Sequence, residues 1–242
     1  WVKVSTCPVG KYRDTSRYPS RGWNAFHTVY QDPQGWMGEG IQDQIYPMMY
    51  FRQNNFYPFV LDWQEQCNGR QIIPGLGIYF LHPDEGNWIR EDVDRQINFI
   101  REHKLAGEAH YRAKYLMDNT QGIYDELTEN FYAHPALQPA MPWLDNVPPS
   151  APSGLKVISG KDGYTSLTWQ AATDNDKMNA PRYVVYASDV YPVDTTRPEN
   201  IIAQGIRGTE YIYAPLQPWN RKVYFAITAV DRYGNEGKAV QE

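Results

Sequence analysis

Apolar residues in the first 135 positions form short, nearly continuous runs, each followed by a segment with a helical period. Runs such as IIPGLGIY are typical of strands that are covered on both faces of a parallel sheet. The pattern therefore predicts four β/α units. Their strands are expected at residues 2–7, 43–51, 71–79 and 107–116.

Helices are predicted where the apolar period and the capping residues agree. Asp32 followed by Pro33 marks the start of a short helix, because proline suits the first helical position. Asn119 and Thr120 are candidate caps for the last helix. Roughly 25 polar and aromatic residues separate the first strand from the next unit, and connections of this length are often functional. The apolar helix faces are expected to comprise Phe56, Phe59, Val60, Trp63 and Cys67, then Val93, Ile97 and Ile100, and finally Ile123, Leu127 and Phe131.

The pattern changes near residues 143–152, WLDNVPPSAP, where closely spaced prolines disfavour both helix and regular strand pairing. Short β-branched and aromatic runs follow at the spacing of a β-sandwich: GLKVIS, TSLTW, RYVVYAS, TEYIYA and KVYFAITAVD. Trp169 and Tyr224 are expected to anchor its core. The chain is therefore predicted to comprise an α/β domain at 1–146 and an all-β domain at 147–242.

These runs resemble a fibronectin type III domain, and the likeness covers essentially all of residues 148–242. The resemblance implies a fold more than a function, because unrelated functions share such folds. The acidic loop TDNDKMN lacks the glycine and terminal glutamate of an EF-hand, so an inter-strand loop facing solvent is expected there.

Composition narrows the class of protein. Of the 242 residues, 42% are hydrophobic and 21% charged, which is typical of a globular chain, and no apolar run is long enough to span a membrane. A formal charge of −5 without a basic stripe argues against nucleic acid as a partner. Two cysteines give neither a disulfide framework nor zinc spacing, so no metal and no cofactor are expected. Aromatic residues reach 14%, and amphipathic rings suit interfaces and sugar faces as well as cores.

Four β/α units alone fit either an open doubly wound sheet or half of an eight-fold barrel. No glycine-rich phosphate loop follows a strand, which weakens the nucleotide-binding alternative. The stretches DQIYPMMYF, IIPGLGIYFLHPDEGNW, GEAHYRAKYLMDNTQGIYDEL and HPALQPAMPWLDNVPPSAP resemble the C-terminal half of glycosyl hydrolase-like proteins of the family 10 type. That resemblance implies the last four strands of a (β/α)8 barrel in a secreted, periplasmic or cell-envelope protein. The acidic Asp-Asp-Tyr stretch of that family has no counterpart here, and Met48 replaces its glutamine.

In a barrel, the carboxyl ends of the strands and the loops after them form the active-site face. The loop from Tyr79 to Trp88 would then line a sugar cleft, with Trp88 as a stacking platform and Asp84 or Glu85 accepting hydrogen bonds from hydroxyl groups. Surface loops that face water are the common alternative. Tyr50 and Arg112 end other strands and are expected at the same mouth. Lys11 and Arg13 are expected at its rim, with Tyr115 and His110 as packing residues.

Glycoside hydrolysis generally uses two carboxylates that flank the scissile bond. No acid lies convincingly at the end of any predicted strand, so no catalytic residue is assigned. The leading hypothesis is the C-terminal part of a glycoside hydrolase that supplies substrate-binding residues and is inactive alone. The alternative is a non-catalytic protein that binds carbohydrate or a cell surface.

Half a barrel would leave two strand edges and one apolar sheet face uncovered, and such edges pair readily with another chain. A homodimer through these edges is therefore expected. The chain opens on a strand-like pattern at Trp1 without a leader, which predicts a processed chain or a piece of a longer protein.

Overall fold

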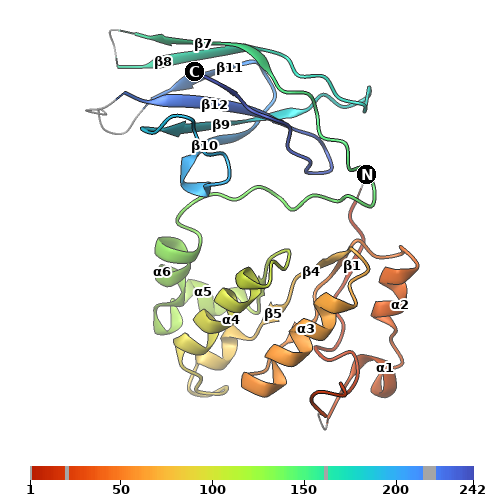
Figure 1. Ribbon diagram of the computed structural model, residues 1–242. Helices are drawn as coiled ribbons and strands as arrows, with labels where there is room; N and C mark the ends of the chain where they lie inside the picture. The colour runs from red at the N-terminus through yellow and green to blue at the C-terminus, as the bar shows by residue number, and fades with distance from the viewer. Residues whose placement is uncertain (1, 20–21, 161–162, 215–221) are drawn as a thin grey trace. The chain divides into compact units, whose positions relative to one another are not determined.

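The computed structural model describes residues 2–19, 22–160, 163–214 and 222–242. The chain forms two compact units, Trp1–Phe131 and Tyr132–Glu242. The first carries parallel strands and helices, and the second carries antiparallel strands (Figure 1).

Unit 1 contains short strands that all pair in parallel. They form two three-stranded sheets, in the orders β1-β2-β4 and β3-β5-β6. The sheets are continuous along the chain, because β2 leads directly to β3 and β4 leads directly to β5. The strands span Ser5–Thr6 (β1), Gln44–Ile45 (β2), Met48–Met49 (β3), Gln71–Ile72 (β4), Gly75–Leu76 (β5) and Ala109–His110 (β6).

Prolines interrupt the long strands that the sequence predicts. Pro47 separates β2 from β3 and Pro74 separates β4 from β5, and proline has no N–H to donate to a ladder. Their carbonyl oxygens still accept hydrogen bonds, from Gly75 N at 2.8 Å and Ala109 N at 3.0 Å. The expected strands at 43–51 and 71–79 are thus interrupted extended segments. The expected strand at 107–116 was too long, because helix α5 (Ala113–Met117) begins three residues after β6.

The strands lie side by side in the order in which they occur along the chain. β1 pairs with β2, β2 with β4, β3 with β5, and β5 with β6. A doubly wound sheet reverses this order at a switch point. The described strands show no such reversal.

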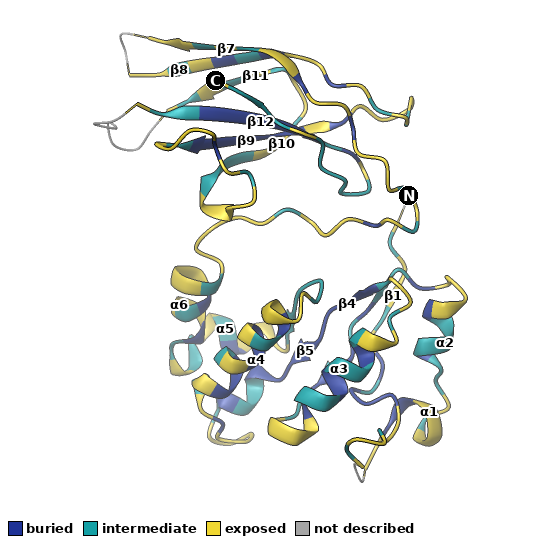
Figure 2. Ribbon diagram, in the orientation of Figure 1, coloured by how far each residue is buried: buried dark blue, intermediate teal, exposed yellow. Residues whose placement is uncertain are grey.

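Two longer helices, α3 (Tyr57–Glu65) and α4 (Arg90–Glu102), bury the apolar faces predicted for them. Phe59, Val60 and Trp63 of α3 have no exposed surface, and neither do Val93, Ile97 and Ile100 of α4. Full burial of a side chain of this size contributes about 1.5–3 kcal/mol. Figure 2 shows that β4 and β5 are buried and that the helices of unit 1 have exposed outer surfaces.

Helix α2 begins at its expected cap, whereas the N-cap of α6 is Gly122 rather than Asn119 or Thr120. The Asp32 side chain accepts a hydrogen bond from Gly35 N at 3.0 Å, and Pro33 is the first residue of α2. Asn119 Oδ1 accepts from Tyr124 N at 2.9 Å at the start of α6. The remaining helical segments are α1 (Ala25–Thr28), α2 (Pro33–Gly38), α6 (Ile123–Glu126), η1 (Gln53–Asn55), η2 (Ile78–Leu81), η3 (Thr120–Gly122) and η4 (Leu127–Phe131).

The two faces of the unit 1 sheets differ in chemistry. Ile45, Ile72 and Leu76 pack in the core with α3 and α4. Because side chains alternate along a strand, Gln44 and Gln71 project from the opposite face. There Gln44 Nε2 donates to Gln71 Oε1 at 2.7 Å. On the β1-β2-β4 sheet, this opposite face is therefore polar at Gln44 and Gln71.

Unit 2 is an antiparallel β-sandwich. One sheet has the strand order β11-β8-β7 and the other has the order β10-β9-β12-β13. The five predicted strands are present, and β10 and β13 are additional. The elements are β7 (Ser153–Ser159), β8 (Thr165–Gln170), β9 (Arg182–Ser188), η5 (Pro198–Asn200), β10 (Ile201–Ile206), β11 (Glu210–Tyr213), β12 (Tyr224–Val230) and β13 (Val240–Gln241).

The sandwich core forms between inward-facing residues of both sheets. Trp169 is 5% exposed and meets Tyr183 edge-on at 5.3 Å between ring centroids, which confirms Trp169 as a core anchor. Tyr224 is only partly buried, at the margin of the core. Tyr186 is fully buried and donates its hydroxyl hydrogen to Glu236 Oε1 at 2.5 Å.

The segment that precedes the sandwich belongs to the second compact unit. Met141 is buried, and its N–H donates to the Tyr233 carbonyl at 2.9 Å. Residues 145–152 contain no helix or strand, as the prolines predict. In the sequence, the boundary between the two units falls after Phe131, before the predicted linker.

Candidate functional site

Three tyrosine rings meet where the parallel strands end. Tyr50 directly follows β3, Tyr111 directly follows β6, and Tyr79 lies three residues beyond β5. Tyr50 stacks on Tyr111 with ring centroids 5.2 Å apart. Tyr79 meets both rings edge-on, at 5.7 Å from Tyr50 and 5.6 Å from Tyr111. We call these three residues the tyrosine cluster.

The tyrosine cluster is partly buried and partly exposed to solvent. Burial, reinforced by Tyr111, Cys7 and Tyr79, raises the pKa of Tyr50 to about 12. Burial also raises the pKa of Tyr79, with a further contribution from Glu85. Tyr111 is 47% exposed, so part of the cluster faces solvent. The raised pKa values keep the Tyr50 and Tyr79 hydroxyl groups protonated at neutral pH, so both retain their hydrogen-bonding capacity.

A polar network lies beside the cluster, on the loop after β5 and at the start of α5. The Tyr115 hydroxyl donates to Glu85 Oε1 at 3.0 Å, and Arg112 Nη2 donates to the Tyr115 oxygen at 3.5 Å. The Arg112 guanidinium also lies 5.5 Å from the centroid of the Tyr115 ring. Glu85 is thus held as an acceptor near a cation.

The structure brings together four of the six predicted binding residues: Tyr50, Tyr79, Glu85 and Arg112. Asp84 lies apart from them, with a side chain that is 91% exposed and 3.8 Å from His82 Nδ1. Its carboxylate faces solvent, which is the common state of a loop residue.

Trp88 lies in the core rather than in an open cleft. It is 7% exposed and stacks on Phe80 with ring centroids 4.7 Å apart. Arg52 lies 5.0 Å from the ring centroid. With its ring occupied in this way, Trp88 offers no open face for sugar stacking.

Lys11 is buried, although the sequence placed it at the rim. It is 5% exposed, and its ammonium lies 4.8 Å from the centroid of Phe51 and 4.6 Å from that of Phe59. Lys11 Nζ donates to Asn55 Oδ1 at 2.8 Å. Burial lowers its pKa, and Asp14 partly opposes that shift.

Of the two expected packing residues, Tyr115 lies in the core and His110 is half-buried. Tyr115 is 3% exposed within the core. His110 belongs to β6, and burial lowers its pKa to about 4, so the imidazole is neutral at physiological pH.

Sequence reasoning missed Tyr111, which completes the cluster. Its signal is its position directly after β6, as Tyr50 directly follows β3. The long strand expected at 107–116 concealed that signal.

No metal site accompanies this arrangement within the part of the chain that the structure describes, because no three His, Cys, Asp or Glu side chains there are grouped to hold an ion. In the loop TDNDKMN, Asp176 instead lies 3.5 Å from Arg232.

None of the helices in the described ranges is both long and apolar enough to cross a membrane.

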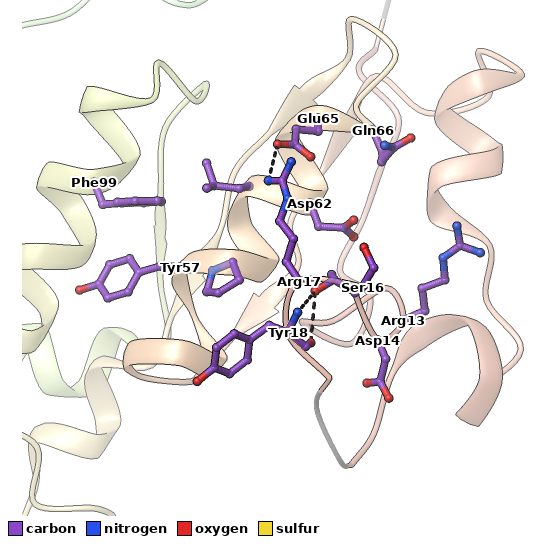
Figure 3. A pocket seen from close by; sticks show the side chains of 13 residues that line it. Arg13, Asp14, Ser16, Arg17, Tyr18, Tyr57, Asp62, Glu65, Gln66 and Phe99 are labelled. Carbon is purple, nitrogen blue, oxygen red and sulfur yellow. Dashed lines mark hydrogen bonds and ion pairs between the residues drawn. The ribbon is translucent and has the colours of Figure 1, made fainter.

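A separate hollow of about 640 Å³ lies on the outer side of α3. The loop 13–18 and one surface of α3 form its walls, with Phe99 of α4 at one end (Figure 3). It includes Arg13 but no residue of the tyrosine cluster. The cluster remains the better candidate for the main site, because ligands of parallel α/β folds bind at the carboxyl ends of strands.

No family model matches the chain. It is similar to the protein named glycosyl hydrolase YngK from Bacillus subtilis (strain 168), with 29% identity over an alignment 256 positions long. The alignment covers 99% of this chain and 49% of that protein, so the chain spans about half the length of its curated relative.

Solved structures of fibronectin type III domains are similar to part of the chain. The FN5 domain of Drosophila Lar shares 15% identity, with 39% of this chain and 94% of that chain covered and a TM-score of 0.27. The sixth fibronectin type III domain of human fibronectin type III domain containing protein 3 shares 16% identity, with 40% and 86% covered and a TM-score of 0.28. Because these identities and TM-scores are low, the assignment of unit 2 as a β-sandwich rests on its strand pairing.

Proposed function

We propose that this chain is the C-terminal part of a glycoside hydrolase and that its tyrosine cluster, with Glu85 and Arg112, contacts a poly- or oligosaccharide substrate. The observation that carries the proposal is the convergence of Tyr50, Tyr79 and Tyr111 where parallel strands end. The similarity of nearly the whole chain to a protein named glycosyl hydrolase supports it.

The chemistry of the cluster suits a sugar. Aromatic rings offer apolar area to the C–H faces of a pyranose, and the phenol groups provide hydrogen bonds at the edge of the same surface. Glu85 accepts and Arg112 donates, so the pair matches hydroxyl groups, which do both. A ligand that is both apolar and rich in hydroxyl groups fits this combination.

We further propose that unit 1 is the second half of a (β/α)8 barrel of the family 10 type. The consecutive parallel order of the strands supports this proposal. The catalytic carboxylates would then lie on upstream strands of a longer protein. A secreted, periplasmic or cell-envelope location belongs to the same proposal.

A non-catalytic carbohydrate- or cell-surface-binding protein is the second candidate. The network of Glu85, Tyr115 and Arg112 contains one carboxylate among the described residues, whereas glycoside hydrolysis generally needs two. This observation favours binding without turnover for the chain as given.

The binding test uses the purified chain on a glycan array, followed by calorimetry with the best oligosaccharide. Tyr111→Ala is expected to weaken binding roughly tenfold, which corresponds to about 1.4 kcal/mol. Tyr124→Ala is the matched control, because Tyr124 is 51% exposed in the same unit and lies outside the cluster. Equal affinity of the Tyr111→Ala variant and the unsubstituted chain would contradict the proposed site.

The activity test separates the two candidates. The chain as given is expected to hydrolyse aryl glycosides no faster than buffer does, since one carboxylate cannot supply both acid and nucleophile. A longer natural protein that contains this chain is expected to hydrolyse the bound sugar. Binding without turnover by that longer protein would instead establish the non-catalytic alternative.

A further inference from the structure

The hollow beside α3 has two chemically different sides. In Figure 3, Tyr18, Tyr57 and Phe99 lie on one side of the hollow and Arg13 and Gln66 on the other, with Asp62 between them. Figure 3 shows Arg17 extending from the loop between these two groups toward Glu65 on the helix. At about 640 Å³, the hollow falls within the range of small-ligand sites.

The ionic groups of the hollow nearly balance. Its lining contains two arginines, Arg13 and Arg17, and three acids, Asp14, Asp62 and Glu65. A site for a phosphate or another strong anion would carry an excess of positive charge. The balance of donors and acceptors favours an uncharged ligand that is rich in hydroxyl groups.

One acceptor in the hollow is already oriented. Gln34 Nε2 donates to Asp62 Oδ2 at 3.2 Å, which fixes the carboxylate on α3. Burial raises the pKa of Asp62, with Gln34 and Arg13 opposing that shift. A partly desolvated carboxylate gains from further hydrogen-bond donors, and sugar hydroxyl groups provide them.

The contact across the hollow is weak enough to open. Arg17 Nη1 lies 3.2 Å from Glu65 Oε1, and the two side chains are 75% and 50% exposed. Exposed pairs of this kind contribute about 0–1 kcal/mol. A ligand can therefore replace this contact with hydrogen bonds of its own at little cost.

From these contacts, we infer that the hollow between loop 13–18 and α3 is a second carbohydrate-binding site, for a neutral oligosaccharide segment. The sugar ring lies against Tyr18 and Tyr57, and its hydroxyl groups meet Asp62, Gln66 and Arg13. The choice of carbohydrate rests on the proposed function. The site itself shares no residue with the tyrosine cluster and would anchor a polymer independently of it.

Affinity electrophoresis tests the inference in native gels that contain mixed-linkage β-glucan, arabinoxylan, glucomannan or amylose. The double variant Tyr18→Ala/Gln66→Ala is expected to lose at least fivefold in affinity for the polysaccharide that retards the unsubstituted chain. Tyr124→Ala is the control and should migrate unchanged. Tyr111→Ala should retain the retardation that this site provides.

The outcomes distinguish this inference from the proposed function. Unchanged retardation of the double variant, or no retardation of the unsubstituted chain in any of the four gels, would overturn the second site. Loss of retardation in Tyr111→Ala alone would assign all binding to the tyrosine cluster and also overturn it. Equal retention by dextran sulfate, abolished by 0.5 M salt, would show an anion site instead. The tyrosine cluster is judged separately by the array and calorimetry.

Discussion

At the level of single residues, burial decides which aromatic side chains are available to a ligand. Trp88 and Tyr111 have similar chemistry, but Trp88 is 7% exposed and Tyr111 is 47% exposed. The tryptophan is held between Phe80 and the Arg52 guanidinium, whereas the tyrosine is accessible at the end of β6. The accessible ring is therefore the one to test for binding.

Trp88→Ala is expected to destabilise the fold rather than weaken sugar binding selectively. Loss of a buried tryptophan typically costs about 3–5 kcal/mol, because the cavity that it leaves collapses only partly. Urea unfolding of the variant measures this loss. Trp23→Ala is the control, since Trp23 is 69% exposed and should change stability little. A Trp88→Ala variant with unchanged stability and reduced affinity for sugar would show that Trp88 is a binding residue.

At the level of elements, side-chain hydrogen bonds add to the backbone pairing in the sandwich. β9 and β12 pair over seven residues, and Glu236 lies beside them. Glu236 Oε1 accepts from Tyr186 on β9 at 2.5 Å and from Thr228 on β12 at 2.6 Å. Burial and the Glu236 contact raise the pKa of Tyr186, so its hydroxyl stays a donor.

Glu236→Ala is expected to reduce stability by about 1–3 kcal/mol, because it leaves the buried Tyr186 hydroxyl without its acceptor. Hydrogen exchange of β9 and β12 peptides measures the change within unit 2. Tyr186→Phe removes the donor, so its combination with Glu236→Ala should cost less than the sum of the two changes. Strict additivity would show that the hydrogen bond does not couple these residues.

At the level of the whole molecule, the strand order of unit 1 leaves β1 and β6 at the edges of their sheets. Each ladder is only two residues long, and the extended backbone beyond it carries donors and acceptors. Unpaired edges favour pairing with another chain. The same edges would be covered by the remaining strands of a complete barrel.

The isolated chain is therefore expected to form dimers or larger assemblies rather than a monomer of 28.0 kDa. Light scattering at several protein concentrations measures the molar mass of the particles in solution. Val4→Lys should shift the distribution toward monomer, because lysine on an edge disfavours pairing. Val147→Lys is the control, as Val4 and Val147 are 49% and 50% exposed, respectively, and Val147 lies outside unit 1. A concentration-independent monomer with a cooperative melt would contradict the open-edge interpretation.

The amino-acid sequence alone determined the helix faces, the α2 cap and most of the sandwich strands of this protein. The 3.6-residue period placed Phe59, Val60 and Trp63 on one buried face, because every helix with that spacing must cover its apolar side. Capping at Asp32 depended only on hydrogen bonds within one turn. Alternating runs after the prolines likewise predicted the sandwich strands and the buried Trp169.

Only the tertiary structure decided which residues meet. Tyr50, Tyr79 and Tyr111 are separated by about 30 residues each along the chain, and parallel pairing in register brought their rings together. Trp88 and Lys11 are residue types that often bind ligands, yet contacts with neighbouring residues bury both of them. The composition of a segment and the spacing of its apolar residues predict its secondary structure and which of its faces is buried. Which side chains remain free for a ligand depends on contacts between segments that are distant in sequence, and these exist only in the folded chain.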